Sequence, residues 1–173
     1  MRRLLVATML LAAGGFSGRG DDNMKTTEPG PEHEPLKAFA GTWELTVDGV
    51  KEKGSAEFKT ILGGRFLIED TKLPFGDFTM EWHGVYGYDR TKKQYTGIWV
   101  DNANNTTVSS TGEADKTGRA FTFRGEQQNP GGGKSKFIWR LSHDSRKALT
   151  IEMFEVSKEG KESLSMTVTG AKK

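Results

Sequence analysis

The side chains best suited to catalysis lie next to a pair of glycines and within one segment rich in aromatic residues. Glu81 and His83 are two positions apart, so on an extended strand they share a face and would shift each other's pKa. Arg65 follows Gly63-Gly64, whose backbone freedom suits a turn that brings an arginine toward a carboxylate. An acid–base site results if the three side chains meet in a polar interior. The alternative is that all three face solvent and the glycines form a bulge.

Further patterns for catalysis or metal binding are missing. The three histidines, His33, His83 and His143, lack the spacing typical of metal ligands. The chain contains no cysteine, which excludes a thiolate nucleophile, a zinc–cysteine site and a disulfide. No serine lies in a nucleophile-elbow context. The sequence therefore predicts no catalytic residue and no metal site, and it favours a protein that is not an enzyme.

Four glutamates, Glu57, Glu69, Glu81 and Glu152, alternate with apolar residues in segments with strand-like patterns. Such alternation is typical of strands with one face toward water. We expect these four carboxylates to face solvent.

The stretch from residue 78 to residue 101 has the most regular pattern in the chain. Apolar residues occupy almost every second position from Phe78 to Tyr88, which indicates a strand with one apolar face. A polar turn at 89–93 and a second strand from Tyr95 to Val100 follow. The pattern predicts a β-hairpin at the centre of the fold.

Similar short strands with turn residues between them continue through the chain. We expect a short helix over 32–40, and then about ten antiparallel strands in an all-β, up-and-down meander closed into a β-barrel. A two-sheet sandwich is the alternative fold.

The chain divides into three parts. Residues 1–20 have two arginines followed by an apolar run, as export signals do, and the run is too short for a transmembrane helix. Residues 21–31 form a polar linker, and 32–173 form a single barrel domain. We expect a periplasmic or extracellular protein; the alternative is an uncleaved tail with translation from Met24.

The charge of the predicted mature chain gives no case for nucleic acid as a partner. Removing Arg2, Arg3 and Arg19 from the 25 basic residues leaves 22 against 23 acidic residues. A near-neutral chain with interspersed charges lacks the basic surface that binds a phosphate backbone. We expect no nucleic acid partner, and the sequence carries no prediction of oligomeric state.

Aromatic residues recur on one face of the predicted meander, as they do in barrel pockets. We expect a small apolar or amphipathic ligand in the lumen. The residues predicted to line it are Trp43, Phe58, Arg65, Phe66, Trp82, His83, Tyr86, Trp99, Phe123 and Trp139.

Several blocks resemble a bacterial family, the domain of unknown function numbered fifteen seventy-nine. The resemblance covers roughly residues 30–170 and implies a lipocalin-like, or calycin-like, barrel. Gly41-Thr42-Trp43 is similar to the Gly-x-Trp that opens lipocalins. Blocks that carry the resemblance further are 61–67, 87–89, 99–101 and 151–155.

The resemblance brings no catalytic residues, and it leaves the cofactor undetermined. Nitrobindins, a related barrel type, hold haem through a late histidine, and His143 is the candidate here, although its Ser-His-Asp context is more typical of a surface turn. We rank ligand binding first. A cell-envelope interaction module anchored by exposed Trp99 or Tyr95 is second, and an enzyme using Glu81, His83 and Arg65 is third.

Overall fold

A computed structural model of the protein describes residues 28–129, 131–144 and 147–173. The predicted export signal and residues 21–27 of the predicted linker lie outside the described residues. In the described part of the chain, no helix is long and apolar enough to cross a membrane.

Two helical turns precede ten strands. The turns are η1 (Pro31–His33) and α2 (Glu34–Lys37), and a further turn, η2 (Leu62–Gly64), separates the second and third strands. The strands are β1 (Gly41–Val47), β2 (Lys53–Ile61), β3 (Phe66–Phe75), β4 (Phe78–Asp89), β5 (Gln94–Asp101), β6 (Val108–Ala114), β7 (Ala120–Gln128), β8 (Lys134–His143), β9 (Ala148–Val156) and β10 (Glu162–Lys172).

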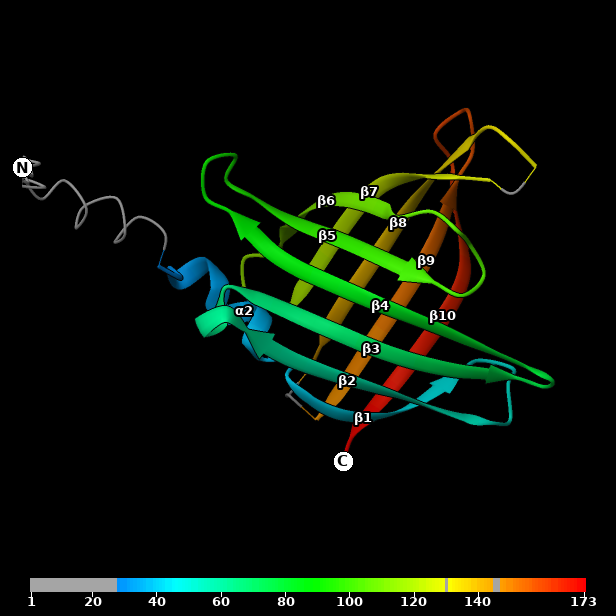
Figure 1. Ribbon diagram of the computed structural model, residues 1–173, viewed down its shortest axis with the longest axis horizontal. Helices are drawn as coiled ribbons and strands as arrows, with labels where there is room; N and C mark the ends of the chain where they lie inside the picture. Colours follow the sequence, from blue (N-terminus) through cyan, green and yellow to red (C-terminus); the bar gives the residue numbers. More distant parts are fainter. Residues whose placement is uncertain (1–27, 130, 145–146) are drawn as a thin grey trace, which may run out of the picture.

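The strands form one closed antiparallel barrel, as predicted (Figure 1). Each strand pairs with the next along the chain, and β1 pairs with β10 to close the circle. Closure leaves no strand with an unpaired edge, which removes the usual route to edge-to-edge aggregation. The alternative of a two-sheet sandwich is excluded by the β1–β10 pairing.

The interior is filled by one residue in two along most strands. In β1, for example, Trp43, Leu45 and Val47 are buried and the residues between them are not. Because neighbouring side chains on a strand point to opposite faces, this alternation places one apolar face inside the barrel. Apart from Ile138, the buried apolar side chains of the described residues belong to one core cluster.

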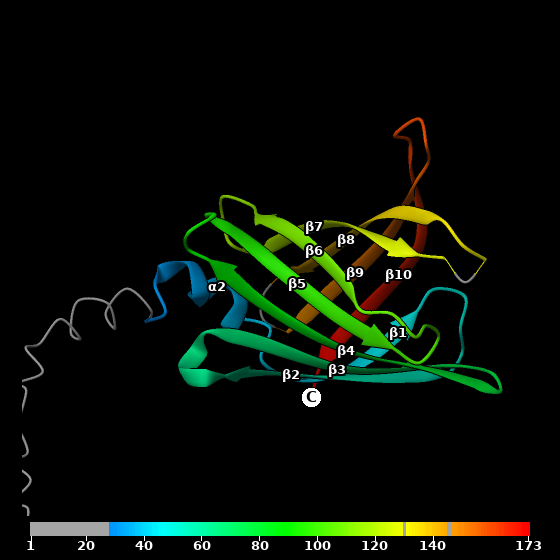
Figure 2. The same cartoon turned by 45° about the horizontal axis from the view of Figure 1, so that its top comes forward.

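The N-terminal turns close one end of the barrel (Figures 1 and 2). Leu36 and Phe39 are buried in the core, and the Trp43 indole Nε1–H donates a 2.8 Å hydrogen bond to the Phe39 carbonyl. Tyr95 likewise donates its hydroxyl hydrogen to the carbonyl of Glu32 at 2.7 Å. These contacts fix the cap to β1 and β5. The opposite end, where β1, β3, β5, β7 and β9 finish, is hereafter called the mouth.

Candidate functional site

A carboxyl group is fully buried inside the barrel. Glu69 lies on β3 and has 0% exposure, so the sequence-based expectation that it faces solvent is wrong. The residues two positions before and after it on the same face, Leu67 and Thr71, are buried as well, and so is Leu73. Leu67 and Leu73 point inward from β3. Glu69 is an even number of positions from both, so its side chain points inward as well. The even spacing of Glu69 from Leu67 and Leu73 is visible in the sequence itself.

Three donors converge on this carboxylate. The Trp82 indole Nε1–H donates to Oε1 at 2.8 Å, and the Thr71 hydroxyl donates to the same oxygen at 2.7 Å. The Tyr86 hydroxyl donates to Oε2 at 2.7 Å. Thr71 is on the same strand and the two aromatic residues are on β4, which pairs with it. A buried polar group normally finds partners in this way, because an unsatisfied one is costly.

Gly84 is what allows Tyr86 to reach Glu69. It stands opposite Glu69 in the β3–β4 register, at the slot in β4 that has no side chain. A Cβ atom there would lie 3.1 Å from the Tyr86 ring and 3.2 Å from its hydroxyl oxygen. The tyrosine ring therefore lies back along its own strand, over Gly84, and places its hydroxyl on the carboxylate.

Burial has the largest effect on the pKa of the Glu69 carboxyl group. It raises the pKa of Glu69, and the hydrogen bonds from Thr71, Tyr86 and Trp82 oppose that rise without cancelling it. Burial and the neighbouring carboxylate also raise the pKa of Tyr86 well above its ordinary value. Glu69 is therefore easier to protonate than a carboxyl in water, and Tyr86 is a hydrogen-bond donor at neutral pH.

Next to this network lies a cavity of about 150 Å³. It opens toward the mouth, between β4, β5, β7, β8 and β9 and the loop after β5. Its lining is Met80, Trp82, Tyr86, Trp99, Asp101, Asn104, Gln127, Trp139 and Met153.

The tryptophans of the lining contact one another. The Trp82 and Trp139 rings lie edge to face with centroids 5.7 Å apart and planes at 89°. The Trp99 and Trp139 rings have centroids 5.7 Å apart and planes tilted by 32°. The Trp139 Nε1–H is buried and has no acceptor within the described residues. An unpaired buried donor costs about 1–3 kcal/mol, so the wall has a polar atom whose hydrogen-bonding capacity is unused.

Polar side chains gather where the cavity meets the mouth. Asp101 ends β5 and accepts hydrogen bonds from the backbone N–H groups of Ala103 and Asn104 at 2.9 and 2.8 Å. This is the side-chain-to-backbone pattern by which aspartate fixes a turn. The carboxylate is thereby held in place at the cavity rim.

Seven of the ten residues predicted to line the lumen are buried inside the barrel. Trp82, Tyr86, Trp99 and Trp139 line the cavity, and Phe123 packs on Tyr86 with ring centroids 5.3 Å apart. The remaining two, Trp43 and Phe58, belong to the core cluster but not to the cavity lining. Their role in ligand binding stays a prediction.

The other three predicted lining residues lie outside the lumen. Phe66 is 37% exposed and covers Gly87 on the outer face, because inward Leu67 follows it on the strand. His83 faces out between inward Trp82 and Gly84, and its Nδ1 lies 2.6 Å from an Asp70 carboxylate oxygen.

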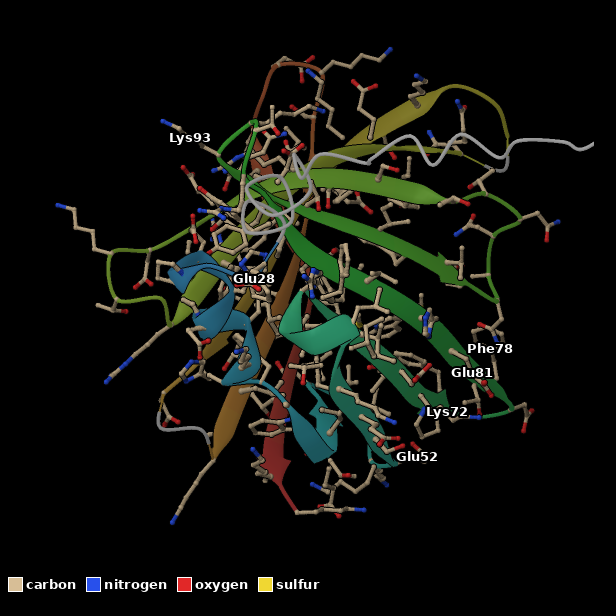
Figure 3. The ribbon with its side chains drawn as sticks, turned by 60° about the vertical axis from the view of Figure 1, so that its left-hand side comes forward. Glu28, Glu52, Lys72, Phe78, Glu81 and Lys93 are labelled. Carbon is tan, nitrogen blue, oxygen red and sulfur yellow. The ribbon has the colours of Figure 1, made fainter. Side chains whose placement is uncertain are left out.

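Arg65 follows the η2 turn and donates to the Leu62 carbonyl at 2.9 Å. Gly63 and Gly64 both have positive φ, as the glycine pair suggests, and the turn they form directs the arginine along the surface. Arg65, Glu81 and His83 therefore do not meet, so the third-ranked hypothesis of an enzyme built on them is wrong, and the alternative in which they face outward is the one that the structure has. Glu81 instead pairs with Lys72 at 3.0 Å on the outer face of β3 and β4 (Figure 3).

The two predicted surface anchors are also placed differently. Trp99 is 9% exposed and Tyr95 is 7% exposed, so both point into the barrel. The apolar residues on the outer face of β5 are instead Ile98 and Val100. Alternation along β5 explains the difference, since the aromatic residues occupy the positions of inward parity.

His143 lies at the capped end, away from the cavity. It ends β8, and its ring meets Phe39 edge to face with centroids 4.9 Å apart. The surface hollow beside it is lined by Glu34, Arg119 and Asp144 among others. Haem requires a largely apolar slot, so these residues do not fit a haem site.

Comparison with known proteins gives a family and no assigned role. The family described as "Protein of unknown function (DUF1579)" matches residues 28–172. No curated protein matches the chain. Among solved structures, one described as a redesigned beta barrel has 16% sequence identity and a TM-score of 0.39, and the match covers 80% of this chain and 95% of that one.

Proposed function

The chain belongs to this family of proteins of unknown function, and we propose that it is a non-enzymatic barrel that binds a small molecule in the interior cavity. The observation that carries the proposal is the cavity of about 150 Å³ walled by Trp82, Trp99 and Trp139. Small barrels are often filled completely by their own side chains. A cavity among Trp82, Trp99 and Trp139 therefore supports a role in ligand binding.

The cavity volume limits the ligand. A cavity of about 150 Å³ holds a molecule the size of benzene, whereas sites for drug-sized ligands occupy about 300–1,000 Å³. The ligand is therefore a single-ring compound or the end group of a longer molecule that extends through the mouth. Asp101, Asn104 and Gln127 at the rim suit the polar part of such an amphipathic ligand.

Isothermal titration calorimetry with two neutral probes tests this proposal. Benzyl alcohol and 3,3-dimethylbutan-1-ol each combine a compact apolar body with one hydroxyl group. Both are expected to bind in the millimolar range or tighter with one site per chain, and the Trp99→Leu variant is expected to bind benzyl alcohol more weakly. The proposal fails if no small probe, neutral or cationic, binds to the folded protein.

We further propose that the protein acts outside the cytoplasm. The support is the sequence pattern of residues 1–20, a basic start followed by an apolar run of signal length. Expression of the full chain in a bacterium, with intact mass measured on the periplasmic and cytoplasmic fractions, provides the test. A periplasmic form that has lost about 18 to 20 residues is expected. A full-length cytoplasmic product would contradict it.

A further inference from the structure

We propose that the group bound in the cavity is a methylated ammonium cation, such as the head group of choline, held in an aromatic cage. The inference rests on the proposed function, since it names the ligand class of the same cavity. It is carried by the aromatic walls, by the Asp101 carboxylate at the rim, and by the lack of free hydrogen-bond acceptors along the inner walls.

The cage consists of Trp82, Tyr86, Trp99 and Trp139. The face of an aromatic ring carries negative electrostatic potential, strongest for tryptophan, and attracts a cation within about 6 Å of the ring centroid. The Trp82 and Trp139 rings meet edge to face, so they form two adjoining walls at right angles to each other. Tetrahedral methylated ammonium groups suit such an arrangement because they offer apolar, positively polarised methyl groups in every direction.

Two members of the cage donate hydrogen bonds to Glu69. The Trp82 Nε1–H and the Tyr86 hydroxyl both point to its carboxylate, at 2.8 and 2.7 Å. Hydrogen-bonded groups polarise one another, and a ring that donates a hydrogen bond gains electron density. The network behind the wall thus strengthens the attraction of these two rings for a cation.

The charges around the cavity have one sign. Asp101 lines the rim, and no lysine, arginine or histidine lines the cavity in the described part of the chain. An anionic ligand would meet a carboxylate at the entrance with no cation to offset it. A cation gains from the Asp101 carboxylate at the rim, because electrostatic interactions are stronger beside an interior of low dielectric constant than in water.

The supply of acceptors favours a methylated cation over a primary ammonium. A primary ammonium has three N–H donors that need acceptors once they are removed from water. Glu69 already accepts from three donors, the inner walls are aromatic rings and the thioethers of Met80 and Met153, and the other side-chain acceptors lie at the rim, on Asp101, Asn104 and Gln127. A quaternary ammonium has no N–H group, so these walls leave nothing on it unsatisfied.

The test compares choline chloride with 3,3-dimethylbutan-1-ol, in which carbon replaces the charged nitrogen and the shape is retained. Calorimetry on the folded full chain is expected to show choline binding about tenfold more tightly, the ratio that corresponds to a cation–π contribution of the usual size. Equal affinities, or tighter binding of the neutral compound, would overturn the cation and leave the small-molecule proposal standing. If neither compound binds and benzyl alcohol does not bind, both proposals fail.

Two variants locate the effect. Asp101→Asn keeps the oxygen that accepts from the Ala103 and Asn104 N–H groups but removes the charge, so it should weaken choline several-fold and leave the neutral isostere unchanged. Trp99→Leu removes one cage ring and should weaken choline by about tenfold. Phe66→Leu removes an aromatic side chain from the outer face and is the matched control. It should change the affinity for neither choline nor the neutral isostere. Unaltered choline binding in both Asp101→Asn and Trp99→Leu would place the cation elsewhere.

Discussion

At the scale of single residues, Glu69 distinguishes this interior from an ordinary apolar core. A carboxyl group between apolar strand positions normally faces water, and that default predicted the wrong side for Glu69. Its placement follows from parity with Leu67 and Leu73, which the sequence contains. The three donors that stabilise it come from Thr71 and from the paired strand, so the identity of the network depended on the β3–β4 register.

The raised pKa of Glu69 predicts a pH-dependent stability. Between the ordinary value of 4.5 and the raised pKa in the folded state, the folded protein binds more protons than the unfolded chain. The free energy of unfolding therefore falls as pH rises through this window, by at most about 1.4 kcal/mol per pH unit for one group. Glu69→Gln, which keeps the size and has no proton to lose, should remove this contribution.

Urea denaturation of both proteins at a series of pH values from 4 upward checks the prediction. The stability of the wild type relative to Glu69→Gln should decrease as pH rises above 4.5 and then become constant. A relative stability that increases with pH would mean that folding lowers the pKa of Glu69 instead of raising it.

At the scale of the strands, alternation placed most of the interior correctly. Trp82, Tyr86 and Trp99 share inward parity with the other buried positions of β4 and β5. Parity also explains the residues that were predicted wrongly, since Phe66 and His83 directly adjoin inward residues. Alternation could not predict that Gly84 leaves space for the Tyr86 ring, because this depends on how the ring lies back along its own strand.

Gly84→Ala should weaken the interior network. The added Cβ would approach the Tyr86 ring to 3.1 Å, so the ring must shift and its hydrogen bond to Glu69 must lengthen. The expected loss in the free energy of unfolding is about 1–3 kcal/mol, the usual cost of overpacking a core. Chemical denaturation measures it.

The control is Gly131→Ala, because a Cβ at that site has no atom within 4 Å. It should change stability by less than about 0.5 kcal/mol. If both alanine variants are equally stable, Gly84 does not determine the position of the tyrosine.

At the scale of the whole molecule, the barrel has a capped end and a mouth with different tasks. The cap is tied to β1 and β5 through the hydrogen bonds of Trp43 and Tyr95, and the cavity opens at the other end. The sequence predicted closure and the short helix, since turn residues and the aromatic pattern recur along the chain. It could not show which aromatic residues pack together and which leave a hollow, because that depends on contacts among five strands.

Separation of the two ends predicts that cap variants affect stability but not ligand affinity. Phe39→Leu reduces a fully buried side chain that contacts Phe58 and Phe121, so it should lower the free energy of unfolding by about 1 kcal/mol or more. Its affinity for choline, measured by calorimetry, should stay within about twofold of the wild type, a difference of about 0.4 kcal/mol. A tenfold loss would show that the cap and the cavity are coupled.

The most direct test of a ligand cavity at the mouth is a titration followed by nuclear magnetic resonance of the indole N–H signals. The chain has 4 tryptophans, of which Trp82, Trp99 and Trp139 line the cavity and Trp43 lies at the capped end. With choline added to the ¹⁵N-labelled protein, three indole signals should shift along a common saturation curve while the Trp43 signal stays in place. Saturating choline that shifts none of the three, or shifts only Trp43, would contradict the account.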